Sequence, residues 1–152
     1  MTFLKESSPK FEFIALRTHH SKTITCQAKC GDFLITSDSF ISVNFPPTFI
    51  DKEESKTFAL KITHGSDVDL QCQTEENPQG DISWFFTPKN GDGRRNIEHA
   101  EKTLKLEWMT EDKEGEYDCQ VENSLGRVKR SFTVVDIPKG EIRKHLIRVT
   151  PL

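Results

Sequence analysis

Residues 104–119 read Leu-Lys-Leu-Glu-Trp-Met-Thr-Glu-Asp-Lys-Glu-Gly-Glu-Tyr-Asp-Cys, and their pattern of apolar and cysteine positions occurs twice in the chain. The pattern consists of Leu104, Leu106, Met109, Tyr117 and Cys119, which match Phe11, Phe13, Leu16, Ile24 and Cys26, each 93 residues earlier. A fixed offset indicates an internal repeat. The match continues, after a one-residue shift in the next turn, between residues 39–46 and 131–138. The first copy begins in mid-unit, so we predict one complete module and the tail of a preceding one.

Length and composition exclude several classes of protein. A chain of 152 residues with 34% hydrophobic and 30% charged residues is long enough for one ordinary domain with spare length. The net charge of −3 creates no general attraction for nucleic acid. No apolar run approaches the roughly 20 residues that a membrane span needs. We therefore expect no nucleic-acid partner and no membrane segment in this chain.

Short apolar runs separated by turn residues recur from Thr48 onward, as is typical of an all-β sandwich or barrel. Alternation of apolar and polar residues predicts strands at 67–72, 81–86, 103–109, 116–122 and 127–137. Proline and glycine predict a turn at 75–80, and residues 123–126 predict a tight hairpin. Residues 87–100 form a polar loop, and no segment shows a helical period. The predicted fold class is all-β.

Cys72, Trp84 and Cys119 fall on three of these strands. In a sandwich of two sheets, such cysteines face each other across the sheets, and the tryptophan packs against their sulfur atoms. Tyr117, two residues before Cys119, is placed to turn its hydroxyl back to the backbone at the entry to the strand.

The combined pattern resembles the immunoglobulin superfamily, specifically its intermediate set, over residues 46–138. It reads Cys72…Trp84…Leu104-x-Leu106…Gly115-x-Tyr117-x-Cys119-x-x-x-Asn123-x-x-Gly126. The resemblance implies an immunoglobulin-like β-sandwich with a Cys72–Cys119 disulfide and with Trp84, Leu106 and Tyr117 in its core. Residues 115–119 and 122–126 are also similar to modules of fibroblast growth factor receptors.

One position departs from the family pattern. The aspartate usual two residues before the glycine is replaced by Lys113, with Asp112 one residue earlier. The family's usual ion pair would then join Asp112 to Arg94 or Arg95.

The repeat and the resemblance together predict three segments. Residues 1–45 would be a partial immunoglobulin-like domain with strands E, F and G only, residues 46–138 a complete domain, and residues 139–152 a linker or the start of a next segment. Cys26 would lack a partner within the chain, and Cys30 stands where the second copy has Asn123. Half a sandwich cannot bury its inner face, so we expect residues 1–45 to be poorly ordered alone.

Five side chains are candidates for a binding surface. If Trp84 points inward, Phe85 points outward on the sheet formed by strands C, F and G, as an anchor for a partner or as a ring covered by neighbouring side chains. Arg94, Arg95, Arg127 and Lys129 are candidates for a patch that binds heparan sulfate or an acidic partner. The alternative is a solvated strand edge that discourages pairing with other chains.

No catalytic or metal-binding motif is present in the sequence. The five histidines are scattered, and no serine or cysteine lies in a nucleophile motif. His19, His20, Cys26 and Cys30 suggest zinc only weakly, because no second matched pair of ligands follows. We therefore expect no enzymatic activity, no metal and no cofactor.

The resemblance implies a non-catalytic module for protein–protein recognition, homophilic or heterophilic, in a multi-domain adhesion molecule or receptor that is extracellular or on the cell surface. One alternative is an intracellular, titin-like structural array of muscle or cytoskeleton, in which cytoplasmic conditions would keep Cys72 and Cys119 reduced. A second alternative is an ectodomain fragment of a receptor tyrosine kinase that binds a growth factor or heparan sulfate.

Overall fold

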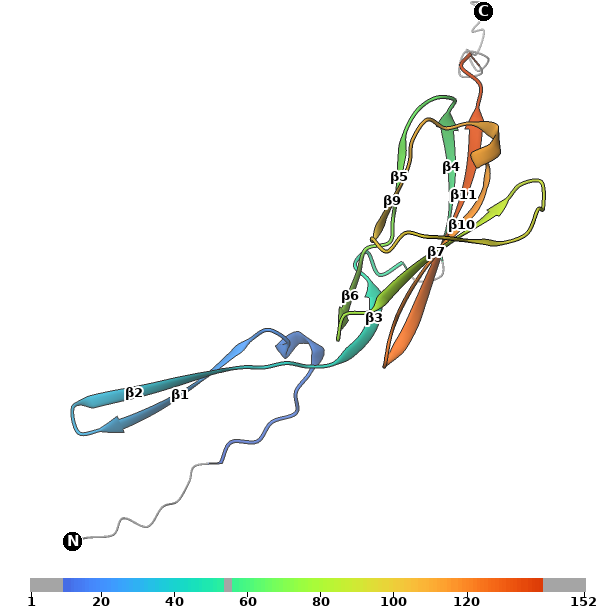
Figure 1. Cartoon of the computed structure of the whole chain (residues 1–152). Helices are drawn as coiled ribbons and strands as arrows, with labels where there is room; N and C mark the ends of the chain where they lie inside the picture. The colour runs from blue at the N-terminus through green and yellow to red at the C-terminus, as the bar shows by residue number, and fades with distance from the viewer. Residues whose placement is uncertain (1–9, 54–55, 141–152) are drawn as a thin grey trace, which may run out of the picture. The chain divides into compact units, whose positions relative to one another are not determined.

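The computed structural model describes residues 10–53 and 56–140 (Figure 1). The chain divides into two compact units, residues 1–44 and 45–152, which are described one at a time. The predicted linker at 139–152 lies outside the described residues from 141 onward. Among the described residues, no helix is both long and apolar enough to cross a membrane.

The described part of the first unit is an antiparallel hairpin preceded by a short turn of helix. The elements are η1 (Arg17–His19), β1 (Thr23–Cys30) and β2 (Phe33–Phe40). Residues 10–16 form no strand, so β1 and β2 are the strands of the described part of this unit. A lone hairpin has no second layer to cover it, and nearly all its residues are exposed.

The hairpin has the same register as its counterpart in the second unit. Cys30 pairs with Phe33 in β1–β2, and Asn123 pairs with Gly126 in the later hairpin, so both turns contain two residues. The offset of 93 residues therefore holds on both sides of the turn, and the one-residue shift expected there from sequence is wrong.

The second unit is built around a five-stranded sheet with the order β4-β11-β10-β7-β8. Its strands are β4 (Thr57–Thr63), β7 (Asp81–Pro88), β8 (Arg95–Ile97), β10 (Gly115–Asn123) and β11 (Gly126–Ile137). Two small antiparallel sheets pair β3 (Phe45–Phe49) with β6 (Thr74–Asn77) and β5 (Val68–Gln71) with β9 (Thr103–Leu106). A short 3-10 helix, η2 (Glu111–Lys113), directly precedes β10.

One hydrophobic core joins all these sheets. Trp84, Cys72 and Cys119 are fully buried, and a disulfide links Cys72, which directly follows β5, to Cys119 on β10. The core also contains Phe49, Leu70, Leu104, Leu106, Met109, Tyr117, Val121, Phe132 and Val134. The predicted all-β sandwich is therefore confirmed. In this structure Cys72 is bonded to Cys119, and Trp84, Leu106 and Tyr117 lie in the core.

The corner before β10 is fixed by Tyr117. Its hydroxyl donates a hydrogen bond of 2.9 Å to the carbonyl of Lys113, and burial raises the pKa of Tyr117 to about 12. The Lys113 ammonium donates to the carbonyls of Glu107 and Trp108, at 2.5 and 3.1 Å. Lys113, which stands where the resembled family usually has aspartate, thus contacts backbone oxygens at this corner. The ion pairs expected with Asp112 are wrong, because Arg94 and Arg95 face other carboxylates.

Two short strands fall where the sequence predicts turn or loop. The segment Thr74–Asn77 pairs with β3 as β6, and only then does Pro78, which lacks a backbone donor, end the strand. The short strand β8 pairs with β7 within the predicted loop. Conversely, the strand expected to reach Met109 ends at Leu106.

Candidate functional site

The outer face of the large sheet carries a row of three paired residues. Phe85 on β7 lies opposite Asp118 on β10, which lies opposite Ser131 on β11. Successive side chains of a strand point to opposite faces, and the neighbours Trp84 and Cys119 point into the core. Phe85 and Asp118 therefore share the outer face, as the sequence predicts for Phe85.

A buried carboxylate organises this face. The Asp118 side chain is only 7% exposed, and the Ser131 hydroxyl donates to its Oδ1 at 2.6 Å. Its Oδ2 lies 3.2 Å from Nη2 of Arg94 and 3.0 Å from Nζ of Lys129. One acidic side chain thus fixes two basic side chains and one hydroxyl on the sheet.

The aromatic ring completes the cluster. The guanidinium carbon of Arg94 lies 3.9 Å from the centroid of the Phe85 ring, a close cation–π contact. The Arg94 side chain nevertheless remains about half exposed. We call these residues, Phe85, Arg94, Asp118, Lys129 and Ser131, the Asp118 surface.

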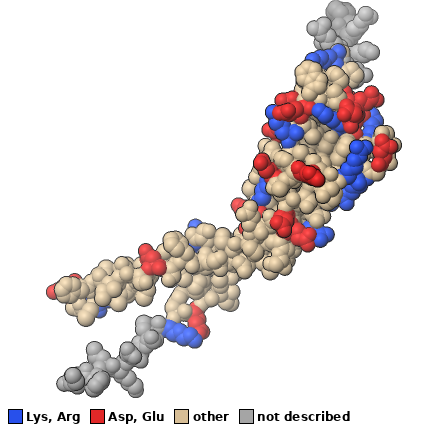
Figure 2. Space-filling model, in the orientation of Figure 1, with Lys and Arg blue, Asp and Glu red and all other residues tan. Residues whose placement is uncertain are grey.

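The other two basic candidates lie apart from this cluster. Arg127 makes a two-pronged contact with Glu122, with both N–O distances at 2.9 Å, and this hydrogen bonding lowers the pKa of Glu122 and raises the pKa of Arg127. Arg95 lies 3.9 Å from Asp92. Each of the four basic candidates therefore faces a carboxylate, and Figure 2 shows acidic and basic side chains interspersed over the second unit.

Sequence reasoning missed Asp118 and Ser131. The available signal was alternation, which places Asp118 on the outer face between the inward residues Tyr117 and Cys119. That pattern ordinarily indicates an exposed carboxylate. Its burial depends on side chains from β11 and from the segment before β8, which only the folded register brings together.

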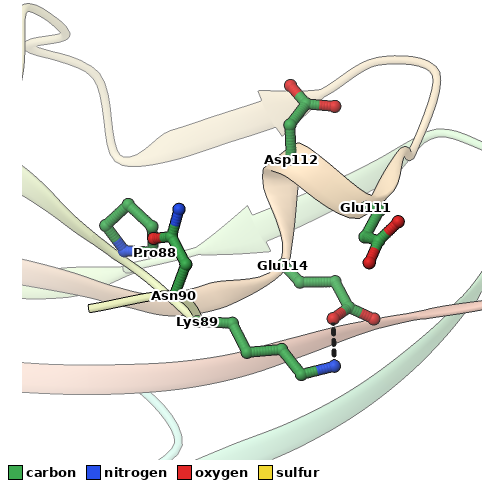
Figure 3. A pocket seen from close by; sticks show the side chains of 6 residues that line it. All are labelled: Pro88, Lys89, Asn90, Glu111, Asp112 and Glu114. Atoms are coloured by element: carbon green, nitrogen blue, oxygen red, sulfur yellow. Dashed lines mark hydrogen bonds and ion pairs between the residues drawn. The ribbon is translucent and has the colours of Figure 1, made fainter. Parts of the chain in front are cut away.

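A shallow pocket of about 510 Å³ lies beside η2 and is lined by Pro88, Lys89, Asn90, Glu111, Asp112 and Glu114 (Figure 3). The Glu114 carboxylate, almost fully buried, accepts from Lys89 at 2.5 Å and from the backbone N–H of Asp136 at 2.8 Å. This bonding raises the pKa of Lys89. The contacts of Glu114 tie β11 to the corner before β10.

Within residues 10–53 and 56–140, no group of three or more histidine, cysteine or acidic residues is arranged to hold a metal ion.

Comparison with known families identifies this architecture. The family model for the immunoglobulin I-set domain matches residues 52–135, more than half of the chain. The chain therefore belongs to the immunoglobulin I-set family, which confirms the family assigned from sequence.

The relatives include adhesion proteins. The chain is 26% identical to human myelin-associated glycoprotein, over 78% of this chain and 18% of that protein. It is also 26% identical to the human neural cell adhesion molecule L1-like protein, over 78% of this chain and 10% of that protein. The chain thus spans less than a fifth of the length of these relatives.

A solved structure of the titin Ig tandem domains A164-A165 shares the fold. The TM-score is 0.59 at 19% identity, and the match covers 77% of this chain and 62% of that chain. At this identity the likeness shows the fold alone.

Proposed function

We propose that the second unit is a non-catalytic recognition module of a larger extracellular adhesion molecule or receptor, and that it binds a protein partner through the Asp118 surface. The observation that carries this proposal is the half-exposed Arg94, stacked on Phe85 and paired with a buried carboxylate. Arginine and aromatic residues are enriched among the residues that dominate protein interfaces. A side chain already held in place loses less entropy on binding than a free one.

The disulfide supports the extracellular setting. Disulfides persist in oxidising compartments and are rare in the cytosol, and the Cys72–Cys119 bond lies at the centre of the core. The adhesion-protein relatives agree with this setting. The rival role, an intracellular structural array, requires the same fold with both cysteines reduced.

A protein partner fits this surface better than heparan sulfate does. Arg94 and Lys129 share Asp118, and Arg127 and Arg95 each face a carboxylate of their own. A sulfated polysaccharide would have to compete with these internal carboxylates for every cation. A protein surface, in contrast, can pack against the half-exposed Arg94 side chain and the partly exposed Phe85 together.

The test is a binding screen with matched variants. The oxidised chain, displayed as a multivalent bait, is screened against a panel of cell-surface ectodomains that includes the chain itself, and in parallel against immobilised heparin. Phe85→Ala and Arg94→Ala are compared with Lys105→Ala. This control also removes a half-exposed cation with carboxylate partners, but Lys105 lies on β9, outside the five-stranded sheet.

We expect binding to at least one ectodomain, with affinity reduced about ten-fold or more by each Asp118-surface variant and little by Lys105→Ala. Binding to the chain itself would identify a homophilic module, and binding to another ectodomain a heterophilic one. Equal effects of Arg94→Ala and Lys105→Ala, or retention on heparin alone, would contradict the proposed surface.

A further inference from the structure

The second unit has an opening between β4 and β5, two strands that follow each other in the chain but belong to different sheets (Figure 1). The segment that contains β3 pairs with β6, up to a hydrogen bond of 3.2 Å from the backbone N–H of Ile50 to the carbonyl of Gln73. The chain then changes sheets, and β4 pairs with β11. Within the described residues, β4 is therefore the end strand of its sheet and β5 pairs with β9 alone, so each has one edge without a strand partner.

A cleft of about 480 Å³ lies at this opening, and we call it the β4–β5 cleft. Its apolar lining includes Phe58, Leu60 and Phe132. Phe58 and Leu60 pack against the hydrophobic core but are only partly buried, so apolar side chains of the inner face are accessible here. Accessible apolar side chains beside an unpaired strand edge favour an extended peptide, which adds a strand to the edge and places alternate side chains in pockets.

The free edge of β5 offers backbone donors to such a peptide. The N–H of Cys72 donates to the carbonyl of Lys102 at 2.7 Å, which continues the pairing of β5 with β9. In an antiparallel pair, successive N–H groups of a strand point to opposite sides. The N–H groups of Asp69 and Gln71 therefore point away from β9, and both residues line the β4–β5 cleft.

The charges of the β4–β5 cleft favour a basic ligand. The Arg130 side chain is only 5% exposed, and its Nη2 donates to Oδ1 of Asp51 at 2.6 Å. Its Nε is buried without a hydrogen-bond partner among the described residues, and this donor suits a neutral acceptor such as a peptide carbonyl. Arg130 is the one basic residue among the described residues that line the cleft, against the two carboxylates of Asp51 and Asp69. An anionic ligand would be repelled by these carboxylates, whereas a cationic one is attracted.

We infer that the β4–β5 cleft is a second interaction surface, whose occupant is an extended, basic segment of a protein partner. The segment pairs with the free edge of β5, inserts an apolar side chain beside Phe58 and Leu60, and brings a lysine or arginine to Asp69. The cleft lies between the sheets, whereas the Asp118 surface lies on the outer face of the large sheet. The inference therefore does not rest on the proposed function.

The test is a titration followed by NMR, with the oxidised 152-residue chain labelled with nitrogen-15 and the blocked peptide acetyl-Lys-Val-Leu-Val-Lys-amide as the probe. We expect saturable shifts of the Asp69 and Gln71 amides and of the Arg130 Nε–H, with a Kd below about 1 mM. Two matched peptides test the charge and the backbone pairing. One carries glutamate in place of both lysines, and the other is N-methylated at its three central residues. Each should bind about ten-fold or more weakly.

Matched variants of the chain complete the test. Asp69→Asn should weaken binding of the basic peptide about three-fold or more. Asp81→Asn, which changes an exposed aspartate on β7 outside the cleft, should leave binding unchanged. Both positions are exposed, so both variants should fold. Phe85→Ala and Arg94→Ala should bind the basic peptide as the wild type does, because they alter the Asp118 surface alone.

The inference is wrong if the basic peptide causes no saturable shift in β5. Equal binding of the acidic or the N-methylated peptide would also overturn it, as would equal effects of Asp69→Asn and Asp81→Asn. None of these results bears on the ectodomain screen, so failure of the β4–β5 cleft and failure of the Asp118 surface are distinguishable.

Discussion

Replacement of Asp118 by asparagine should destabilise the second unit far more than its position on an outer sheet face suggests. Asparagine keeps the shape of the side chain but removes the charge that Arg94 and Lys129 share. A hydrogen bond to a charged group contributes about 1.5–3 kcal/mol and a neutral one about 1 kcal/mol, so the weakened Ser131 contact costs about 1 kcal/mol. The two half-exposed ion pairs add about 0.5 kcal/mol each. The sum of about 2 kcal/mol corresponds to a fall in Tm of about 8–15 °C for a domain of this size.

The assay is thermal unfolding at pH 7, followed by circular dichroism, of the wild type, Asp118→Asn and Glu122→Gln. Glu122 is the matched control, because it lies four residues along β10 and also pairs with an arginine, but its side chain is 47% exposed. We expect a much smaller change in Tm for Glu122→Gln. If Asp118→Asn unfolds within about 1 °C of the wild type, Asp118 does not hold the cluster together and the magnitude derived above is wrong.

Three further predictions follow from individual residues of the second unit. Tyr117 is the chain's one tyrosine, and its pKa is raised by burial to about 12, so absorbance at 295 nm should show ionisation near pH 12 in the folded protein and near pH 10 in urea. The stability that this shift provides is complete below pH 10 and should be lost as the pH rises from 10 to 12, which urea titrations across that range will check. Gly115→Ala should lower the Tm by several degrees more than Gly91→Ala. Both glycines have positive φ, but only at Gly115 would a Cβ lie 2.2 Å from a backbone oxygen. Equal Tm values for the two variants would contradict this. Arg127 lowers the pKa of Glu122, so the ion pair stabilises the fold only while Glu122 is ionised. The difference in stability between wild type and Glu122→Gln should therefore vanish as the pH falls below the usual carboxyl range. A difference that persists at pH 2 would contradict the pairing.

The parts of the fold that depend on residue spacing could be predicted from the sequence. Cys72, Trp84 and Cys119 are large or reactive side chains at fixed intervals on alternating strands, and the structure buries all three together. The hairpin at 123–126 follows from its turn residues alone. The hairpin depends on local residues, whereas the spacing of Cys72, Trp84 and Cys119 is part of the family pattern that the sequence matches.

The parts that depend on neighbours from distant strands could not be predicted in this way. The strand β6 carries polar residues before a proline and reads as a turn, yet its backbone pairs with β3, nearly thirty residues away. The burial of Asp118 likewise requires Arg94 and Lys129 from two other strands or loops. The basic residues suggested a positive patch, but their carboxylate partners become neighbours only in the folded sheet.

The redox state of Cys72 and Cys119 in the natural protein tests the central claim, an extracellular recognition module, most directly. The measurement is the intact mass after alkylation without reduction, followed by peptide mapping. We predict that neither cysteine is alkylated and that the two are recovered in one disulfide-linked pair. Free, alkylated thiols at both positions would contradict the account and point to a structural role inside the cell.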